Sequence, residues 1–353
     1  MKILQVMAGG EHGGAETAYV DITIAMHDAG FEVEAVTRPN DVRVPALEKA
    51  GIKVHTLPFG GPVDVFTTWK LSRIIKKFEP SIVQTWMTRA TQKTLNWNAL
   101  KTPKPYLVVA RLGGYYKIKN FSSADYFVAN TPELKQHIMN GGIAEDRIRM
   151  ITNFAPREVA DTVVEKSDLD TPSSAPVLLA LGRLHKNKAH DILIRAAALL
   201  PGVYVWIAGE GEDRAALEKL AADLGVSERV KFLGWRTDRA ALMQACDICV
   251  FVSRVEPFGN VYVQAWQSRV PVIVSDASGM KQFCRPDEDC VMVPVENPEA
   301  TASAVRRVLA DTALAEIIVT NGYRRFEEEF TKERCVAAYN DYYIEILTRE
   351  GIL

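Results

Sequence analysis

The chain contains 353 residues, of which 48% are hydrophobic and 24% are charged, and it carries a formal net charge of −2 at pH 7. This length exceeds what one ordinary hydrophobic core supports, so the composition predicts a soluble globular protein with two domains. The nearly neutral charge argues against nonspecific nucleic-acid binding as the main role, because such binding requires a basic excess. A membrane-spanning helix is not expected, since no apolar run approaches the roughly 20 residues that one needs.

Strand and helix patterns alternate from the amino terminus. Met1–Val6 is interpreted as a first strand and not as a signal peptide, because this apolar run is short and leads into a glycine-rich turn. Helical patterns such as Ala15–Ala29 and Thr68–Phe78 separate the apolar runs that follow. The strands expected in this half are Lys2–Ala8, Glu32–Thr37, Lys53–Phe59, Ile82–Met87, Tyr106–Leu112, Tyr126–Asn130 and Arg149–Thr152.

The polar segment Val159–Pro176 predicts a linker or domain edge, and the alternation then starts again. Arg214–Leu224 is the clearest helical pattern of this second half, and a terminal amphipathic helix is expected from Thr331 onward. The expected strands are Val177–Leu181, Tyr204–Ala208, Val230–Leu233, Ile248–Ser253, Pro271–Ser275 and Val291–Val295.

Continuous apolar runs separated by helices are typical of parallel sheets that are buried on both faces. We therefore expect an α/β protein with two doubly wound, Rossmann-like domains facing across a cleft. The expected boundaries are 1–165 for the first domain and 166–334 for the second. Ligands bind in such folds beyond the carboxyl ends of the strands, and each motif described below follows an expected strand.

The segment from Glu256 to Gln264 is the most informative motif, and it reads as the start of a helix after a strand. The backbone N–H groups of Phe258 to Val261 would be free there, and free amides at a helix start suit a phosphate. The carboxylate of Glu256 and the amide of Gln264, one turn after Asn260, suit sugar hydroxyls. The combination predicts a nucleotide-sugar site.

The glycine-rich loop at residues 9–14 lies between the first strand and the first helix. Its glycines allow close approach of backbone to a ligand, although their spacing is not the G-x-G-x-x-G dinucleotide fingerprint. The loop is read either as a tight turn or as a contact to a diphosphate or sugar. His12 is either a polar contact in the cleft or an ordinary loop histidine.

Arg183 and Lys188 follow the first strand of the second half, and the two cations could converge on one diphosphate. The alternative is a solvated basic loop. Gly209 and the Leu233–Gly234 pair follow the next two strands, where turn glycines and backbone groups could face the same ligand.

The cysteines are odd in number and show no dense framework, which points to reduced thiols in a cytoplasmic protein. Cys246-x-x-Cys249 is similar to a redox or zinc motif, but no second Cys/His pair has matching spacing, so two buried thiols are expected. The other three are Cys284, Cys290 and Cys335.

The second half resembles the retaining glycosyltransferases of family 4, which have the GT-B fold. The matching segments are Gly182–Leu184 with Lys188, Ile207–Gly211, Val230–Gly234 and Glu256–Gly259, while Gly13–Glu16 fits the first loop of the family. As a linked set in this order the motifs are specific, and the resemblance covers nearly the whole chain. It implies that the terminal helix, 335–353, returns to the first domain.

The resemblance also implies a role for each matching position. Arg183 and Lys188 would hold the donor diphosphate, and Glu256 would contact donor-sugar hydroxyls near the reacting carbon. These three are the catalytic candidates. The donor-binding candidates are Gly13, Gly14, Gly209, Leu233, Gly234, Phe258, Gly259, Asn260, Val261 and Gln264.

The sequence departs from the family pattern in three places. Gln264 replaces the usual Glu at the ribose-binding position, as a neutral amide. Two histidines often seen after strands of the first domain are also missing, at Val83–Met87 and at Ala110–Gly114. Trp86 and Arg111 from these segments, together with His12, are expected to shape the acceptor or donor-sugar pocket.

The expected reaction is retaining transfer from a UDP-, GDP- or ADP-sugar to a glycan or lipid-linked acceptor, an activity of the hexosyltransferase type (EC 2.4). No cofactor and no metal are expected, because basic residues would neutralise the leaving diphosphate in place of a divalent ion. Family analogy makes lipopolysaccharide or another envelope glycan the expected product.

Basic residues outnumber acidic ones within residues 1–165, and the segment Trp69–Phe78 forms a basic amphipathic helix pattern. It is read either as an ordinary surface helix or as a weak contact to an anionic membrane surface. The expected location is cytoplasmic. If the helix contacts a membrane, the protein would attach peripherally to the inner face of the cell membrane.

Two other functions stay open at this stage. One is a nucleotide-sugar epimerase on the same architecture, which would act without an acceptor. The other is a non-catalytic nucleotide-sugar binding protein, prompted by Gln264 and the missing histidines, although the retained Glu256, Arg183 and Lys188 argue against it.

Overall fold

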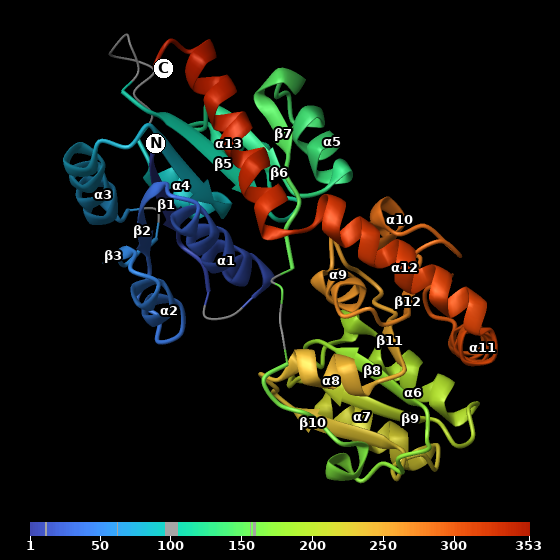
Figure 1. Cartoon of the computed structure of the whole chain (residues 1–353). Coiled ribbons are helices and arrows are strands. Elements are labelled where there is room, and N and C mark those ends of the chain that lie inside the picture. The colour runs from blue at the N-terminus through green and yellow to red at the C-terminus, as the bar shows by residue number, and fades with distance from the viewer. Residues whose placement is uncertain (11–12, 62, 96–104, 156, 158–159) are drawn as a thin grey trace. The chain divides into compact units, whose positions relative to one another are not determined.

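The computed structural model divides the chain into two compact units, which Figure 1 colours along the sequence. Met1–Asn153 and Lys332–Leu353 form the first unit, and Phe154–Thr331 forms the second. The structure describes residues 1–10, 13–61, 63–95, 105–155, 157 and 160–353. Whereas the sequence suggests boundaries at 165 and 335, the chain divides after Asn153 and returns at Lys332.

The first unit is built on a seven-stranded sheet in which every paired neighbour is parallel. The strand order is β3-β2-β1-β4-β5-β6-β7, so the chain moves outward from β1 in one direction and then crosses back to β4. Each expected apolar run of this half forms a strand. The strands are β1 (Lys2–Met7), β2 (Glu32–Thr37), β3 (Lys53–Thr56), β4 (Ile82–Trp86), β5 (Leu107–Leu112), β6 (Tyr126–Ala129) and β7 (Ile148–Met150).

Helices connect these strands, and the last helix of the chain, α13 (Lys332–Arg349), packs on the same unit (Figure 1). Tyr339, Tyr342 and Tyr343 of α13 are buried, because their rings lie on the apolar face of the helix. The expected return of the terminal helix is thereby confirmed. The other helices of this unit are α1 (Gly14–Asp28), α2 (Arg43–Lys49), α3 (Val65–Phe78), α4 (Met87–Lys93) and α5 (Pro132–Asn140).

The second unit has a six-stranded parallel sheet in the order β10-β9-β8-β11-β12-β13. Because the order reverses between β8 and β11, the loops that follow these two strands flank the crevice where such sheets bind ligands. All six strands lie within or next to the expected runs. They are β8 (Val177–Leu181), β9 (Tyr204–Ala208), β10 (Val230–Gly234), β11 (Ile248–Phe251), β12 (Val272–Ser275) and β13 (Val291–Val293).

Helices on both faces of this second sheet bury its Val, Ile and Leu side chains in two clusters. No helix in the described part of the chain is long and apolar enough to cross a membrane. The helices are α6 (His190–Ala198), α7 (Arg214–Asp223), α8 (Arg239–Ala245), α9 (Asn260–Gln267), α10 (Ser278–Phe283), α11 (Pro298–Ala310) and α12 (Thr312–Glu329).

Candidate active site

An ion pair between Lys188 and Glu256 joins the loops that follow β8 and β11. The Nζ of Lys188 donates to Oε2 of Glu256. The two side chains are only 26% and 15% exposed, and the ammonium also lies 5.2 Å from the centre of the Phe251 ring. A partly desolvated cation and anion are thus held at the carboxyl edge of the sheet, where two neighbouring strands end.

Arg183, the other expected diphosphate ligand, lies on the same loop as Lys188 with an exposed side chain. The backbone beneath it is held by His190, a residue that the sequence analysis did not single out. His190 is 5% exposed, and burial is the main cause that lowers its pKa to about 4, while hydrogen bonds with the backbone of Arg183 and Gly182 oppose the shift. A neutral imidazole therefore supports the loop that carries both cations.

Glycines let the loops of this edge contact one another backbone to backbone. A Cβ at Gly209 would lie 1.9 Å from the carbonyl oxygen of Gly182, and one at Gly279 would lie 2.2 Å from that of Glu256. The N–H of Gly279 donates to that same Glu256 oxygen at 2.9 Å. Only glycine fits at these two positions. The segment after β9 therefore packs on the loop that carries Lys188, and the segment after β12 packs on the loop that carries Glu256.

The start of α9 supplies the amides that the sequence predicts, shifted slightly along the chain. Gly259, with φ of 81°, is the residue before the helix, and no side chain caps its amides. Phe258 is 4% exposed and packs on Phe283 and Phe330, so only its backbone can reach a ligand. The free N–H groups are therefore those of the first turn, which begins at Asn260.

The remaining donor-binding candidates lie on this edge with partial exposure. Asn260 and Gln264 are half-buried and share one face of α9, as expected from their spacing. Gly234 has φ of 69°, and its carbonyl oxygen accepts from the N–H of Gly209 at 2.8 Å, so the ends of β9 and β10 are tied together. Leu233 of β10 and Val261 of α9 are half-buried.

Arg254 links the loops of this site through hydrogen bonds and ion pairs, and the sequence analysis did not identify it. Its guanidinium donates two hydrogen bonds to Asp191, at 2.8 and 2.6 Å, and pairs with Glu296, and these contacts raise its pKa. It also donates to the carbonyl oxygen of Lys186 at 2.6 Å, which ties the cationic loop to the strand end that leads to Glu256. The signal in the sequence was its position two residues before Glu256.

In the first unit, Gly10 and Gly13 of the glycine-rich segment lie beside the carboxylate of Glu16. The N–H of Gly10 donates to Oε1 of Glu16 at 2.8 Å, and a Cβ at Gly13 would lie 2.4 Å from Oε2. Nothing lies within 4 Å of a Cβ built on Gly14, so that position faces open space. His12 lies outside the described residues.

Trp86 and Arg111 have a different environment from the expected sugar pocket. Each is 1% exposed, and the guanidinium of Arg111 lies 4.4 Å from the centre of the Trp86 ring. The Nε of Arg111 donates to the hydroxyl of Tyr339 at 2.8 Å, and the indole of Trp86 donates to Gln5 at 2.7 Å. In this structure the pair fastens α13 to the sheet, so the expectation that it lines a pocket is replaced by a packing role.

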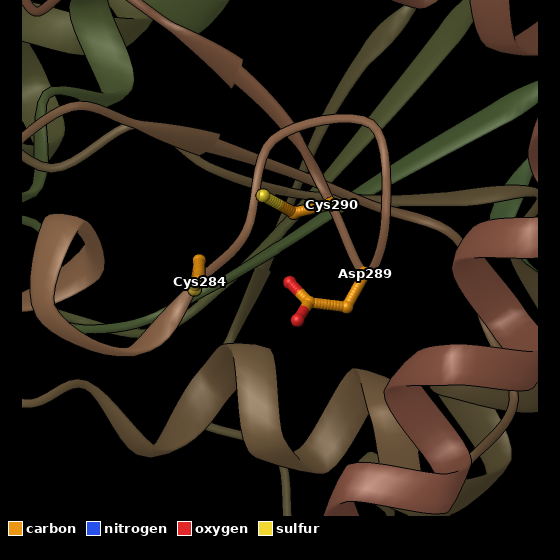
Figure 2. A group of neighbouring side chains, drawn as sticks. All are labelled: Cys284, Asp289 and Cys290. Carbon is orange, nitrogen blue, oxygen red and sulfur yellow. The ribbon is translucent and has the colours of Figure 1, made fainter.

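One group in the second unit has the composition of a metal site. Figure 2 shows Cys284, at the end of α10, with Asp289 and Cys290, which precede β13, and their ligand atoms lie within 4.8 Å of one another. However, Asp289 already pairs with Arg325 at 2.8 Å and accepts from the N–H of Arg285 at 2.8 Å. Burial raises the pKa of Cys284 well above its usual range. The group is thus a buried ion pair between Asp289 and Arg325 that lies beside two cysteines.

Two Asp-x-Asp segments also occur, the sequence type that often holds a divalent ion in sugar transfer. In Asp168-Leu169-Asp170, the first carboxylate caps a short turn by accepting from the N–H of Glu165 at 3.2 Å. In Asp287-Glu288-Asp289, the two aspartates pair with Arg307 and Arg325. Both segments therefore contribute to local structure.

Comparisons with known proteins find relatives of this chain among glycosyltransferases. Residues 163–325 match the family model "Glycosyl transferases group 1", and residues 12–158 match "Glycosyltransferase Family 4". The lipopolysaccharide core biosynthesis glycosyltransferase LpsE of Rhizobium meliloti (strain 1021) is 33% identical over 343 residues, 96% of each chain. LpsD of the same strain is 30% identical, over 97% of this chain and 98% of LpsD.

A solved structure of Anabaena Alr3699/HepE in complex with UDP superposes with a TM-score of 0.85 at 20% identity, over 98% of this chain and 100% of HepE. At this identity the likeness concerns the fold, and it confirms the expected GT-B architecture of two parallel-sheet units.

Proposed function

The chain belongs to the glycosyltransferases with the GT-B fold, and we propose that it is a retaining enzyme that transfers a sugar from a nucleoside diphosphate to a glycan or lipid-linked acceptor. The observation that carries this proposal is the Lys188–Glu256 pair next to the uncapped start of α9. It places a cation, a carboxylate and free amides together at the carboxyl edge of one sheet.

Each part of this arrangement matches a need of the reaction. Breaking a glycosyl–phosphate bond leaves negative charge on the diphosphate, which Lys188, Arg183 and the amides of α9 would stabilise without reorganising. Glu256 accepts hydrogen bonds and would orient the hydroxyls of the donor sugar. Its salt bridge to Lys188 holds both side chains in place before the donor binds.

Retention of configuration is proposed on the same basis. Among the described residues, the contacts of Glu256 include a cation, Lys188, and no second carboxylate that would form a glycosidase-like pair with it. In the proposed mechanism the leaving phosphate oxygen takes the acceptor proton on the face from which it departs. No metal is proposed, because cationic side chains fill that electrostatic role.

The donor is proposed to be a nucleotide sugar with UDP, GDP or ADP as the leaving group. UDP binds to the structural relative HepE, which favours a UDP-sugar here. Gln264 would bond the ribose hydroxyls as a neutral amide, from a half-buried position one turn along α9 from Asn260. The names of LpsE and LpsD favour an acceptor in the lipopolysaccharide core.

Weak attachment to an anionic membrane is proposed for the first unit through α3. This helix has four cations and no carboxylate between its ends, and Val65, Phe66 and Trp69 at its start are 50–78% exposed. Its basic end borders a groove of about 440 Å³ at the amino ends of β1, β2 and β3. Exposed aromatic and aliphatic side chains beside cations suit the headgroup region of a bilayer.

A thermal-shift screen with UDP-, GDP- and ADP-sugars tests the proposed donor class, because a ligand that binds only the folded state raises the melting temperature. The proposal predicts a rise with one class and a smaller rise in the Lys188→Ala variant. Product analysis with the donor alone then separates the functions: a sugar epimer would indicate an epimerase, and binding without hydrolysis or transfer would indicate a binding protein.

A further inference from the structure

The first unit holds two arginines, at the carboxyl edge of its sheet, that bind the same oxygen. Arg38 follows β2 directly, and Arg89 lies in the first turns of α4, which follows β4. The Nη2 of Arg38 and the Nη1 of Arg89 both donate to the carbonyl oxygen of Phe59, at 2.5 and 3.3 Å. Two guanidinium groups are therefore close enough to contact one small anion.

No carboxylate lies within ion-pair distance of either side chain in the described part of the chain. Arg38 has one further contact, from Nε to the carbonyl oxygen of Pro58 at 3.2 Å. Two other arginines contrast with this arrangement, since Arg254 and Arg325 each pair with two carboxylates. Carbonyl oxygens carry only a partial charge, so the positive charges of Arg38 and Arg89 are not neutralised.

The two positive charges repel each other. Burial and, after it, the charge of Arg89 lower the pKa of Arg38. Arg43 adds to the positive potential from behind. It is 3% exposed and donates to the carbonyl oxygen of Gly10 at 3.1 Å, and its Nη2 has no partner among the described residues. Glu16 is the nearby carboxylate that partly offsets Arg43. An anion bound between Arg38 and Arg89 would relieve this imbalance.

The backbone that gathers the two arginines is held rigidly. Phe59 has φ of 44° and a fully buried ring, and its N–H donates to Oγ1 of Thr67 at 3.1 Å. Asp64 accepts from the N–H groups of Gly60 and Thr67 at 2.7 and 2.9 Å. The Phe59 carbonyl thus keeps its direction, and the arginines are positioned before any ligand arrives.

We propose that Arg38 and Arg89 form a binding site for an anionic group, a carboxylate or phosphate, on the acceptor glycan. The inference rests on the proposed function, because only a glycosyltransferase has an acceptor glycan to bind. The site lies at the same edge of the sheet as the glycine-rich loop. Arg38 is half-buried and Arg89 is exposed, so a sugar substituent can reach both. Planar guanidinium forks match the two oxygens of such a group.

Inorganic phosphate tests the site without requiring turnover. Thermal unfolding is followed with rising phosphate at constant ionic strength in the wild type, the Arg38→Gln/Arg89→Gln variant and the Arg183→Gln/Lys188→Gln variant. The proposal predicts that the first variant loses a part of the phosphate-dependent stabilisation that the second variant keeps. Equal stabilisation of the wild type and Arg38→Gln/Arg89→Gln would overturn it, whatever the reaction turns out to be.

Initial rates with matched anionic and neutral acceptor glycans test the source of the anion. The wild type should prefer the anionic acceptor, and Arg89→Gln should raise its KM about tenfold or more, as for a lost charge-assisted hydrogen bond, with a smaller change for the neutral one. Arg38→Lys/Arg89→Lys, which keeps the charges, should restore part of the preference. An unchanged preference in Arg89→Gln would contradict the acceptor assignment even if phosphate stabilises the protein.

Arg306 offers a matched control. It is an exposed arginine of α11 that likewise donates to a backbone carbonyl oxygen, that of Leu199 at 2.8 Å. Arg306→Gln should keep both the phosphate response and the acceptor preference. Should the double variant fail to fold, Arg89→Gln alone carries the test, because Arg89 is exposed and its hydrogen bond within the described part of the chain is one contact to the backbone.

Discussion

Lys188 and Glu256 form an ion pair although 68 positions separate them in the chain. They meet because β8 and β11, which precede them, are adjacent parallel strands. The pair lies between the uncapped start of α9 and a loop whose backbone is fixed by its neighbours. This relationship is the basis of the proposed reaction.

Removing either cation of the loop should slow transfer. Lys188→Ala and Arg183→Ala are each expected to lower kcat about 100-fold, the usual effect of losing one preorganised group that stabilises developing charge. Steady-state kinetics with the identified donor would measure this. Lys186→Ala is the control, because Lys186 is exposed on the same loop. Near-normal turnover in both single variants would remove this account of leaving-group stabilisation.

Gly279→Ala should displace the loop that carries Glu256. The added methyl would lie 2.2 Å from the Glu256 carbonyl oxygen, so the backbone must move. We expect a loss of donor binding and a destabilisation of about 1–3 kcal/mol, as for overpacking. Calorimetric binding and urea unfolding would measure both, with Gly61→Ala as the control because nothing lies within 4 Å of its Cβ. Unchanged binding in Gly279→Ala would show that the loop adapts.

Folding stability should depend on pH through His190. Its folded pKa of about 4 lies below the unfolded value near 6.5, so between these values the unfolded chain binds more protons. Stability is therefore full above about pH 6.5 and falls as the pH drops toward 4, by about 2 kcal/mol between pH 7 and pH 5. Urea unfolding at the two pH values would measure it. His190→Asn should lose this component, and an identical pH dependence in wild type and variant would contradict the assignment.

Tyr339→Phe should loosen α13 from the first unit. Losing the hydroxyl leaves the Nε–H of the buried Arg111 without an acceptor, which costs about 1–3 kcal/mol. Urea unfolding and proteolysis of the terminal helix would report the change. Tyr115→Phe is the matched control, because its hydroxyl bonds to Glu133 at the surface. Equal stability of the two variants would mean that the Arg111 contact is replaceable.

Trp69→Ala should weaken binding of the protein to vesicles of anionic phospholipid. Trp69 is 50% exposed, and Lys70 and Arg73 lie 5.4 and 5.3 Å from its ring, which places apolar and basic groups together. Co-sedimentation with anionic and zwitterionic vesicles would measure the effect. Trp235→Ala, which removes a 76% exposed tryptophan of the second unit, is the control. Binding that does not depend on lipid charge would contradict the membrane proposal.

Much of the fold follows from the sequence because apolar runs that are buried on both faces have few alternatives. The ends of the elements were harder to predict. The run Lys53–Phe59 forms a strand only to Thr56, since Pro58 has no N–H for the ladder and Arg38 takes the carbonyl oxygens of Pro58 and Phe59. Helix α3 begins at Val65, before the expected Thr68, because Asp64 caps it.

The candidate site also has parts that the sequence predicts and parts that it does not. Glu256, Lys188 and the start of α9 could be placed because each follows a strand, and strand ends gather at one edge. The environment of Arg111 could not be predicted, since its partner Tyr339 lies 228 positions away. Nor could the roles of Arg254 and His190, which act through contacts with backbone that only the folded chain shows.

The most direct test of the central claim is a crystal structure of the protein with its nucleoside diphosphate bound. We predict that the diphosphate oxygens lie about 3 Å from the Nζ of Lys188 and from a guanidinium nitrogen of Arg183, with an amide of the first turn of α9 completing the site. A diphosphate bound elsewhere, with Lys188 still paired only to Glu256 and Arg183 directed into solvent, would contradict the account.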